Sequence, residues 1–249
     1  MKLGDFQRKF ELLAEETGMH IGDGSMNFYA NNGRNRGLFQ LRGHISDDKE
    51  YYEDHIKTLY KELYGISVSI RRMPSTGVLG FQLWSDELVD FKGKLGLPLG
   101  KKGDIKIPEI FFTKKDTKTA IIRGIFDTDG CVYLERKRGK IYPRVEIRTI
   151  STPLAEQLMK IMTGLNIRAT RYKTIRKNKN WRDVWCINVR GFTEVREFFT
   201  KVKPKNPKHL NKFSKLVSSY PPNDEADNRK VAGSNPARPT NIISLIKII

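Results

Sequence analysis

The sequence contains little that would suit a secreted or membrane-embedded protein. Its two cysteines, Cys131 and Cys186, lie far apart and outside any cluster of metal ligands, so neither a disulfide framework nor a zinc site is expected. No apolar run approaches the roughly 20 residues of a membrane-spanning helix, and the first ten residues contain no signal-peptide core. We therefore expect a protein that is not secreted, enters no membrane, and resides in the cytoplasm beside the nucleoid or in an organelle.

Acidic residues are scarce relative to basic ones. Asp and Glu number 28 against 46 Lys and Arg, which gives a formal net charge of +18 over 249 residues. Such an excess of positive charge is typical of a protein that binds a polyanion, and nucleic acid is the leading candidate. With 38% hydrophobic residues, the chain can bury the core of one large domain or of two small ones. A wholly disordered chain is thus excluded.

A repeat with an offset of 106 residues organises the sequence. The segment 22–26, GDGSM, returns as 128–132, TDGCV, and the segment 39–42, FQLR, returns as 145–148, VEIR. Because a repeat of this length copies a whole set of secondary-structure elements, the two halves should share one architecture.

Each half is expected to contain helices and strands in the order αββαββα. In the first half, apolar periodicity predicts helices at 6–22, 48–64 and 86–95, with strands at 25–31, 36–45, 66–73 and 78–84. The equivalent helices of the second half lie at 116–128, 152–164 and 192–200, and its strands at 131–138, 142–150, 167–175 and 181–189. Asp47 and Ser151 are the expected N-caps of the middle helices, which should end close to Gly65 and Gly164.

Composition also predicts where the halves begin and end. The segment 97–108 is rich in Pro, Gly and Lys, which is typical of a connection between domains. We expect a first half at 1–97, a linker at 98–110, a second half at 111–219, and a tail at 220–249 without fixed structure, because apolar periodicity stops there.

Small residues lie four positions apart in both opening helices. Gly18 precedes Gly22 in the first, and Gly124 precedes Thr128 in the second. Such ridges let two helix backbones approach closely, and close packing would offset the roughly 1 kcal/mol that a helical Gly costs relative to Ala. We therefore expect these four residues to form the interface between the two helices.

An Asp-Gly pair follows each ridge, at Asp23 and at Asp129. The carbonyl end of a helix carries negative potential, so an acid there needs a positive partner. Two adjacent carboxylates bind hard divalent cations such as Mg²⁺ or Mn²⁺, and the carbonyls of Gly22 and Thr128 are candidate additional ligands. Asp-Gly by itself is a common turn signal. Two copies in phase with the repeat favour the metal-binding interpretation.

These residues carry a family resemblance. Residues 122–130, IRGIFDTDG, resemble the LAGLIDADG signature with conservative changes, and residues 17–24, TGMHIGDG, match its Gly, small residue and Asp-Gly. His20 and Ile21 stand where the family usually has other residues. The resemblance, to the single-chain, two-motif LAGLIDADG homing endonucleases, covers residues 6–215. It implies an α+β monomer of two pseudo-symmetric halves, packed through the motif helices and forming a saddle of antiparallel β-ribbons.

The resemblance implies an activity. Such enzymes hydrolyse one phosphodiester on each strand of a long, asymmetric double-stranded DNA target, depend on Mg²⁺ (or Mn²⁺), and are encoded in introns. Asp23 and Asp129 would be the catalytic, metal-binding acids. Family blocks resembled by 95–102, LGLPLGKK, and 206–210, NPKHL, usually hold a lysine, which implies Lys102 and Lys208 near the scissile phosphates. For any one lysine among so many, a solvated surface position is the alternative.

The resemblance also implies that the β-ribbons lie in the major groove, where Arg and Gln contact base edges and other cations contact phosphates. The candidate DNA-binding residues are Arg34, Arg36, Gln40, Arg42, Arg71, Arg136, Arg138, Arg144, Glu146, Arg148, Arg171, Lys173 and Arg176. His44 and Glu146 are also candidates to position water, although a satisfied surface contact is the expected role of both, and helix packing is the expected role of His20. The halves differ, as at Gln40 against Glu146, which predicts an asymmetric target.

A non-cleaving protein on the same scaffold is the main alternative, either an RNA-binding intron maturase or a DNA-binding regulator. The presence of both acids argues against simple loss of activity. A free-standing enzyme is expected rather than an intein, because there is no N-terminal Cys or Ser and no terminal His-Asn pair. In the tail, residues 233–236, GSNP, can be encoded by GGT TCG AAT CCC, which contains a tRNA T-arm consensus. The tail is therefore a candidate translated tRNA exon.

Overall fold

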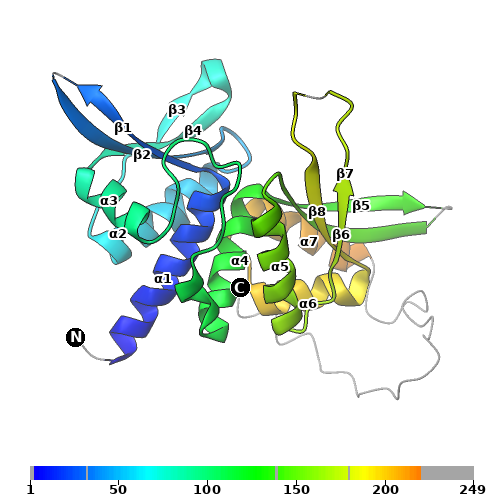
Figure 1. Ribbon diagram of the computed structural model, residues 1–249. Coiled ribbons are helices and arrows are strands. Elements are labelled where there is room, and N and C mark those ends of the chain that lie inside the picture. Colours follow the sequence, from blue (N-terminus) through cyan, green and yellow to red (C-terminus); the bar gives the residue numbers. More distant parts are fainter. Residues whose placement is uncertain (1–2, 32, 138–139, 179, 220–249) are drawn as a thin grey trace.

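The computed structural model describes residues 3–31, 33–137, 140–178 and 180–219. The predicted tail and Arg138 lie outside these residues. Two four-stranded antiparallel sheets extend to either side of two central helices, α1 (Leu3–Gly22) and α4 (Lys115–Asp129), which lie side by side (Figure 1). None of the described helices combines the length and the apolar character that crossing a membrane requires. The α+β architecture of two similar halves is as predicted.

In the first half, the chain forms one sheet with the strand order β1-β2-β4-β3. After α1 the elements are β1 (Gly24–Asn31), β2 (Arg34–His44), a π-helical segment (Tyr51–Ile56) that continues as α2 (Lys57–Tyr64), β3 (Arg71–Met73), β4 (Val78–Trp84) and α3 (Asp86–Lys94). The side chain of Ser85 caps α3 by accepting a hydrogen bond from the Leu88 N–H.

The second half repeats this plan with the strand order β5-β6-β8-β7. After α4 come β5 (Gly130–Lys137), β6 (Lys140–Thr149), α5 (Thr152–Gly164), β7 (Thr170–Thr174), β8 (Val184–Arg190), α6 (Phe192–Val202) and α7 (Pro207–Ser219). Gly24 pairs with Leu41 in the first sheet, and Gly130 pairs with Ile147 in the second. Both partners are displaced by the offset seen in the sequence, so the repeat extends to the strand register.

Three of the predicted helix ends agree with the structure and one does not, and α5 ends at Gly164 as predicted. Ser151 caps α5, because its Oγ accepts a hydrogen bond from the Leu154 N–H at 3.2 Å. Gly65 ends α2 in the left-handed region, at φ 71°. The prediction that Asp47 caps the first middle helix is wrong, since its carboxylate pairs with His44 instead. The neighbouring Asp48 accepts a hydrogen bond from the His44 N–H at 2.8 Å.

Helix α7 is absent from the predicted αββαββα order. It begins at Pro207, a residue favoured at the first helical position, and the preceding Asn206 is a preferred N-cap. Asn206 Oδ1 accepts a hydrogen bond from the Lys208 N–H at 3.1 Å. The second half therefore ends with one more helix than the first, and this helix places Lys208 near the centre of the molecule.

The two central helices touch through their backbones at the predicted ridge residues. A β-carbon added to Gly18 would lie 2.9 Å from Ile125 N and 3.0 Å from Gly124 Cα. One added to Gly124 would lie 2.8 Å from Met19 N and 3.0 Å from Gly18 C. Such distances leave no room for a side chain at either position. The halves thus pack through the motif helices, and the ends of those helices are brought together.

Buried ion pairs fix α1 against its surroundings. Lys92 of α3 and Glu16 of α1 are both fully buried, and Lys92 Nζ donates to both Glu16 carboxylate oxygens at 2.6 Å. Across the helix interface, Arg123 of α4 donates to Glu15 of α1 at 2.7 Å. Loss of one partner would leave an uncompensated buried charge, so these pairs oppose rotation of α1 about its axis.

Candidate metal and nucleic-acid site

The two motif acids lie together at the carbonyl ends of α1 and α4. A β-carbon added to Gly22 would lie 2.8 Å from Thr128 Cβ and 3.3 Å from Asp129 Cγ. The residue that precedes Asp23 therefore touches the residues of the second motif. Asp23 is half-buried, whereas Asp129 is exposed to solvent on one side of an otherwise enclosed position. The paired acids can thus be reached from outside the protein.

Both acids hold their protons more tightly than an ordinary carboxyl group does. Burial raises the pKa of Asp23 to about 7, with further contributions from the nearby charges of Asp129 and Asp48. The Tyr52 hydroxyl opposes this rise by donating a hydrogen bond to Asp23 Oδ2 at 3.1 Å. Burial also raises the pKa of Asp129, and Lys102 and Lys208 partly offset that rise. A divalent cation between two such carboxylates would relieve both repulsion and desolvation.

A lysine contacts the carbonyl end of each motif helix. Lys102 Nζ donates to the last three carbonyl oxygens of α1, residues 20–22, at 2.5–3.2 Å. Lys208 Nζ donates to Asp48 Oδ1 at 2.8 Å and to the Thr128 carbonyl oxygen of α4 at 3.4 Å. Both ammonium groups lie where the helix dipole is negative and close to the two acids. The structure therefore brings the two predicted lysines to equivalent positions in the two halves.

The residues of this centre fit a divalent cation. The carboxylates of Asp23 and Asp129 and the neighbouring carbonyls of Gly22 and Thr128 are hard oxygen ligands, which Mg²⁺ and Ca²⁺ prefer. Across residues 3–219, with the gaps given above, no group of three or more His, Cys, Asp and Glu residues forms a complete metal site. Mg²⁺ usually binds through one or two carboxylates and completes its shell with water and substrate phosphates.

Residues 116–203 match the family model of the LAGLIDADG-like domain. A mesophilic variant of the homing endonuclease I-DmoI superposes with a TM-score of 0.57 and 16% identity, covering 78% of this chain and 91% of that one. The LAGLIDADG meganuclease I-AabMI bound to uncleaved DNA superposes with a TM-score of 0.53 and 12% identity, covering 82% of this chain and 88% of that one. The homing endonuclease I-GzeII in complex with its DNA target superposes with a TM-score of 0.55 and 14% identity, covering 84% of this chain and 89% of that one. The chain carries a LAGLIDADG-like domain and has the LAGLIDADG homing endonuclease fold.

One curated protein is also similar in sequence. The ATP-dependent DNA helicase Hel308 of Methanocaldococcus jannaschii is 25% identical over 113 residues, which are 42% of this chain and 9% of the helicase. The chain therefore spans about a tenth of the length of that relative, and the helicase activity is a property of that protein.

In this LAGLIDADG fold, the first sheet presents the predicted DNA-binding residues on the face opposite the buried Phe39 and Leu41. Arg42 of β2 and Arg71 of β3 both lie opposite Gly80 of β4, so their side chains share one face and flank a position without a side chain. Strand alternation places the other members of β2 on the same face. These are Arg34, Arg36 and Gln40.

In the second sheet, Arg144 and Arg148, the latter equivalent to Arg42, are held by acidic partners. Arg148 Nε donates to Glu146, and Arg144 pairs with Glu135. Glu146 is 1% exposed, and it also accepts a hydrogen bond from the Tyr133 hydroxyl at 3.2 Å. Burial leaves Glu146 no direct access to a base edge, so its carboxylate orients Arg148, which is exposed. The surroundings of Glu146 thus agree with the satisfied contact expected for it and not with a base contact.

The structure does not bring the remaining predicted cations to the same face. Arg171 lies opposite Ile187, and Lys173 lies opposite Trp185, on the face that packs against the core. Both cations stack over the Trp185 ring. Arg136 is exposed near the tip of the β5–β6 hairpin. The first and second sheets therefore differ in which cations their open faces present.

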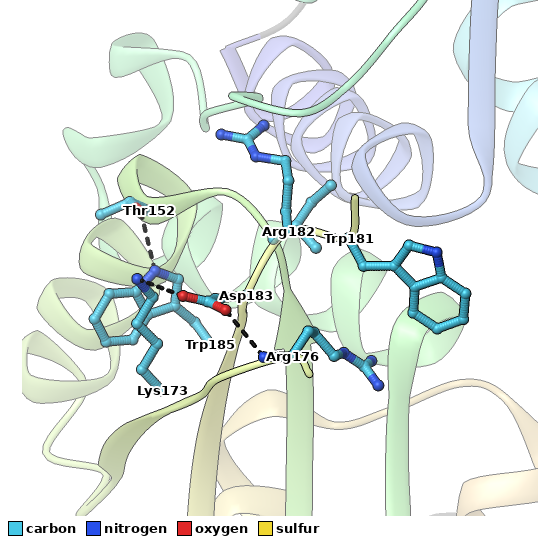
Figure 2. A pocket seen from close by; sticks show the side chains of 8 residues that line it. Thr152, Lys173, Arg176, Trp181, Arg182, Asp183 and Trp185 are labelled. Carbon is cyan, nitrogen blue, oxygen red and sulfur yellow. Dashed lines mark hydrogen bonds and ion pairs between the residues drawn. The ribbon is translucent and has the colours of Figure 1, made fainter. Parts of the chain in front are cut away.

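Lys173 and Arg176 instead line a hollow of about 390 Å³ beside the start of α5. Figure 2 shows Asp183 at its centre, where it pairs with Lys173 Nζ at 3.0 Å and accepts a hydrogen bond from the Arg176 backbone N–H at 3.0 Å. The other lining residues are Ile150, Thr152, Trp181, Arg182 and Trp185. This hollow lies apart from the paired acids.

Three polar residues of the acid centre were not predicted, namely Asp48, Tyr52 and Asn206. Asp48 and Tyr52 are four residues apart, a spacing that places two side chains on one helix face and was the signal available in the sequence. Asn206 belongs to the NPKHL segment, in which only the lysine is a predicted site residue. The two histidines behave as expected: His20 is buried with its ring 5.4 Å from that of Phe39, and His44 is exposed.

Proposed function

We propose that this chain is a DNA endonuclease that hydrolyses one phosphodiester on each strand of a long, asymmetric double-stranded target. The observation that carries the proposal is the pairing of Asp23 and Asp129 at the ends of two packed helices, each with a lysine beside it. The structural neighbours add support, because I-DmoI, I-AabMI and I-GzeII are described as bound to DNA.

Asp23 and Asp129 would hold Mg²⁺ or Mn²⁺. I-DmoI has been solved with target DNA and Mn, with target DNA and Mg, and with DNA and Ca. A cation bound there activates water and stabilises charge on the attacking and leaving oxygens. Lys102 and Lys208 would place positive charge beside the scissile phosphates, where an anion develops during hydrolysis. Each acid would serve mainly one strand.

The open face of the first sheet would contact base edges in the major groove. Arg42 and Arg71 have no acidic partner among the described residues, and each has the geometry to bind guanine through two hydrogen bonds. In the second sheet, Arg148 would reach the groove in an orientation set by Glu146. Because the two sheets present different side chains, the two halves of the target should differ in sequence.

Further features of the proposal follow from the family resemblance. We expect a monomer encoded within an intron, with halves at 1–97 and 111–219 joined by a linker at 98–110. We place it beside the nucleoid or in an organelle. The natural target would then be the sequence formed when the two segments that flank the intron are joined.

A second candidate function is the binding of intron RNA on the same scaffold. The hollow in Figure 2 favours it, because Trp181 is 63% exposed there and is accompanied by Arg176 and Arg182. Exposed aromatic rings next to cations stack on the bases of single-stranded RNA. Loss of RNA binding and splicing on Trp181→Ala, with DNA cleavage intact, would establish this second function.

The proposed function is tested with a duplex that carries the joined flanking sequences, labelled separately on each strand. We expect cleavage of both strands in the presence of Mg²⁺, and no cleavage when EDTA replaces it. A second probe, duplexes selected for binding from random-sequence DNA, covers the case in which the gene does not lie in an intron. Failure to cut either probe, under conditions in which the protein binds it, would overturn the endonuclease proposal.

A further inference from the structure

A third acid, Asp48, lies beside the paired motif acids and, unlike them, is buried. It is 3% exposed, and its charge contributes to the raised pKa of Asp23. Burying a carboxylate next to other carboxylates is unfavourable unless hydrogen bonds and cations compensate it. The burial of Asp48 therefore has to be compensated by specific contacts.

Asp48 binds the start of α7. Its Oδ1 accepts hydrogen bonds from Asn206 Nδ2 at 2.7 Å and from Lys208 Nζ at 2.8 Å, and its Oδ2 accepts one from the His44 N–H at 2.8 Å. Asn206 and Lys208 are the cap and the second residue of α7, where the helix dipole is positive. The Asp48 carboxylate therefore lies at the positive end of the α7 dipole and in contact with the Lys208 ammonium.

The same segment is bound from the other side by Asp127 of the second motif. Asp127 Oδ2 accepts a hydrogen bond from the Lys205 N–H at 2.8 Å, and the Asp127 carbonyl oxygen accepts one from Asn206 Nδ2 at 2.8 Å. Residues 205–208 are thus held between an acid of the first half and an acid of the second. The Lys208 ammonium is thereby directed to the end of α4, next to Asp129.

Lys102 is held differently. Its ammonium donates to three carbonyl oxygens at the end of α1, at 2.5–3.2 Å, and none of its hydrogen bonds within the described residues goes to a carboxylate. Lys208 makes a single hydrogen bond to the end of α4, at the Thr128 carbonyl oxygen, and this bond is longer, at 3.4 Å. The strong bond that places Lys208 is the one to Asp48.

We propose that Asp48 is a positioning residue that holds Lys208 in place for the cleavage of one strand, whereas Lys102 needs no such partner for the other. The inference rests on the proposed endonuclease function. Asp48 acts only through Lys208, so its loss should slow the strand that Lys208 serves and leave the other strand unchanged. Displacing a catalytic group by about 1 Å can cost on the order of 10²-fold in rate.

A double-mutant cycle tests this dependence. Single-turnover cleavage of each labelled strand is measured for Asp48→Asn, Lys208→Met and the double variant, on the same duplex as above. We expect Asp48→Asn to slow one strand on the order of 10²-fold, so that nicked DNA accumulates, and the double variant to cut no more slowly than Lys208→Met. Asp47→Asn, an exposed acid one residue away, is the matched control and should cleave normally. Equal slowing of both strands, or losses that multiply in the double variant, would contradict the proposal.

A second measurement does not depend on cleavage. In the DNA-free protein, acetylation of lysines by a small anhydride is followed by mass spectrometry. Lys208 should react slowly in the natural protein and as fast as the exposed Lys101 in Asp48→Asn, while Lys102 stays slow in both. If Lys208 is equally reactive in both proteins, Asp48 does not hold it. If this test succeeds but no duplex is cut, the endonuclease function fails while the contact between the two residues stands.

Discussion

Asp23→Asn and Asp129→Asn should each abolish double-strand cleavage while leaving DNA binding intact. Each acid is expected to hold a cation that stabilises charge in the transition state, and losing about 4 kcal/mol of such stabilisation lowers the rate about 10³-fold. The amide has the same size as the carboxyl and relieves the repulsion between the two acids, so the fold should persist. The measurement is single-turnover cleavage of each labelled strand, with binding measured separately in the presence of Ca²⁺.

The control for this prediction is Asp90→Asn, which removes an equal charge from the exposed surface of α3. It should cleave both strands at the natural rate. A variant that lacks either motif acid and still makes double-strand breaks at the natural rate would show that the acids are not paired for catalysis.

Gly124→Ala should lower the free energy of unfolding, although alanine is the better helix former. The added β-carbon would lie 2.8 Å from Met19 N and 3.0 Å from Gly18 C, and backbone atoms cannot move aside by changing rotamer. Overpacking costs about 1–3 kcal/mol in side-chain cores, and here it outweighs the roughly 1 kcal/mol gained in helix propensity. We expect a net loss of up to about 2 kcal/mol, which lowers Tm by up to roughly 4–8 °C in a chain of this size.

The same substitution in a helix with free space supplies the matched control. Gly93 lies near the end of α3, and nothing approaches within 4 Å of an added β-carbon there. Gly93→Ala should therefore raise the free energy of unfolding by about 0.5–1 kcal/mol. Opposite signs for the two substitutions in thermal or denaturant unfolding are the expected result. A stabilising Gly124→Ala would show that the motif helices do not pack backbone to backbone.

The architecture could be predicted because the repeat and the local patterns agree. The four-residue spacings that begin at Gly18 and at Gly124 bring small residues together only in a helix. Alternation along β2 distinguishes the buried Phe39 and Leu41 from the residues that follow each of them. These are local periodicities, and a 106-residue offset carries them from one half to the other. Strand β1 pairs with β2 in the same register as β5 pairs with β6, so the offset stays constant through both hairpins.

The faces of the β7–β8 hairpin could not be predicted. Every residue of β7 is exposed, so the strand lacks the alternation that reveals which side faces the core. Arg171 and Lys173 were grouped with the other hairpin cations for their charge alone. The structure places them over Trp185, a tertiary contact for which the local sequence contains no signal.

The role of Asp48 was missed for a related reason. Asp47 and Asp48 are equally good capping residues, and local sequence does not distinguish an acid that caps a helix from one that binds a segment 160 residues away. Helix α7 and the contacts of Asn206 belong to the same long-range arrangement. Residues whose partners come from the other half of the chain are thus the ones that sequence patterns leave undetermined.

We propose that the carboxylates of Asp23 and Asp129 bind shared divalent cations at the ends of the two motif helices. Anomalous diffraction from crystals of the DNA complex grown with Mn²⁺ tests it most directly. We expect an anomalous peak within coordination distance of carboxylate oxygens from both residues and of a DNA phosphate. Mn²⁺ peaks that lie elsewhere, or that contact neither carboxylate, would contradict it.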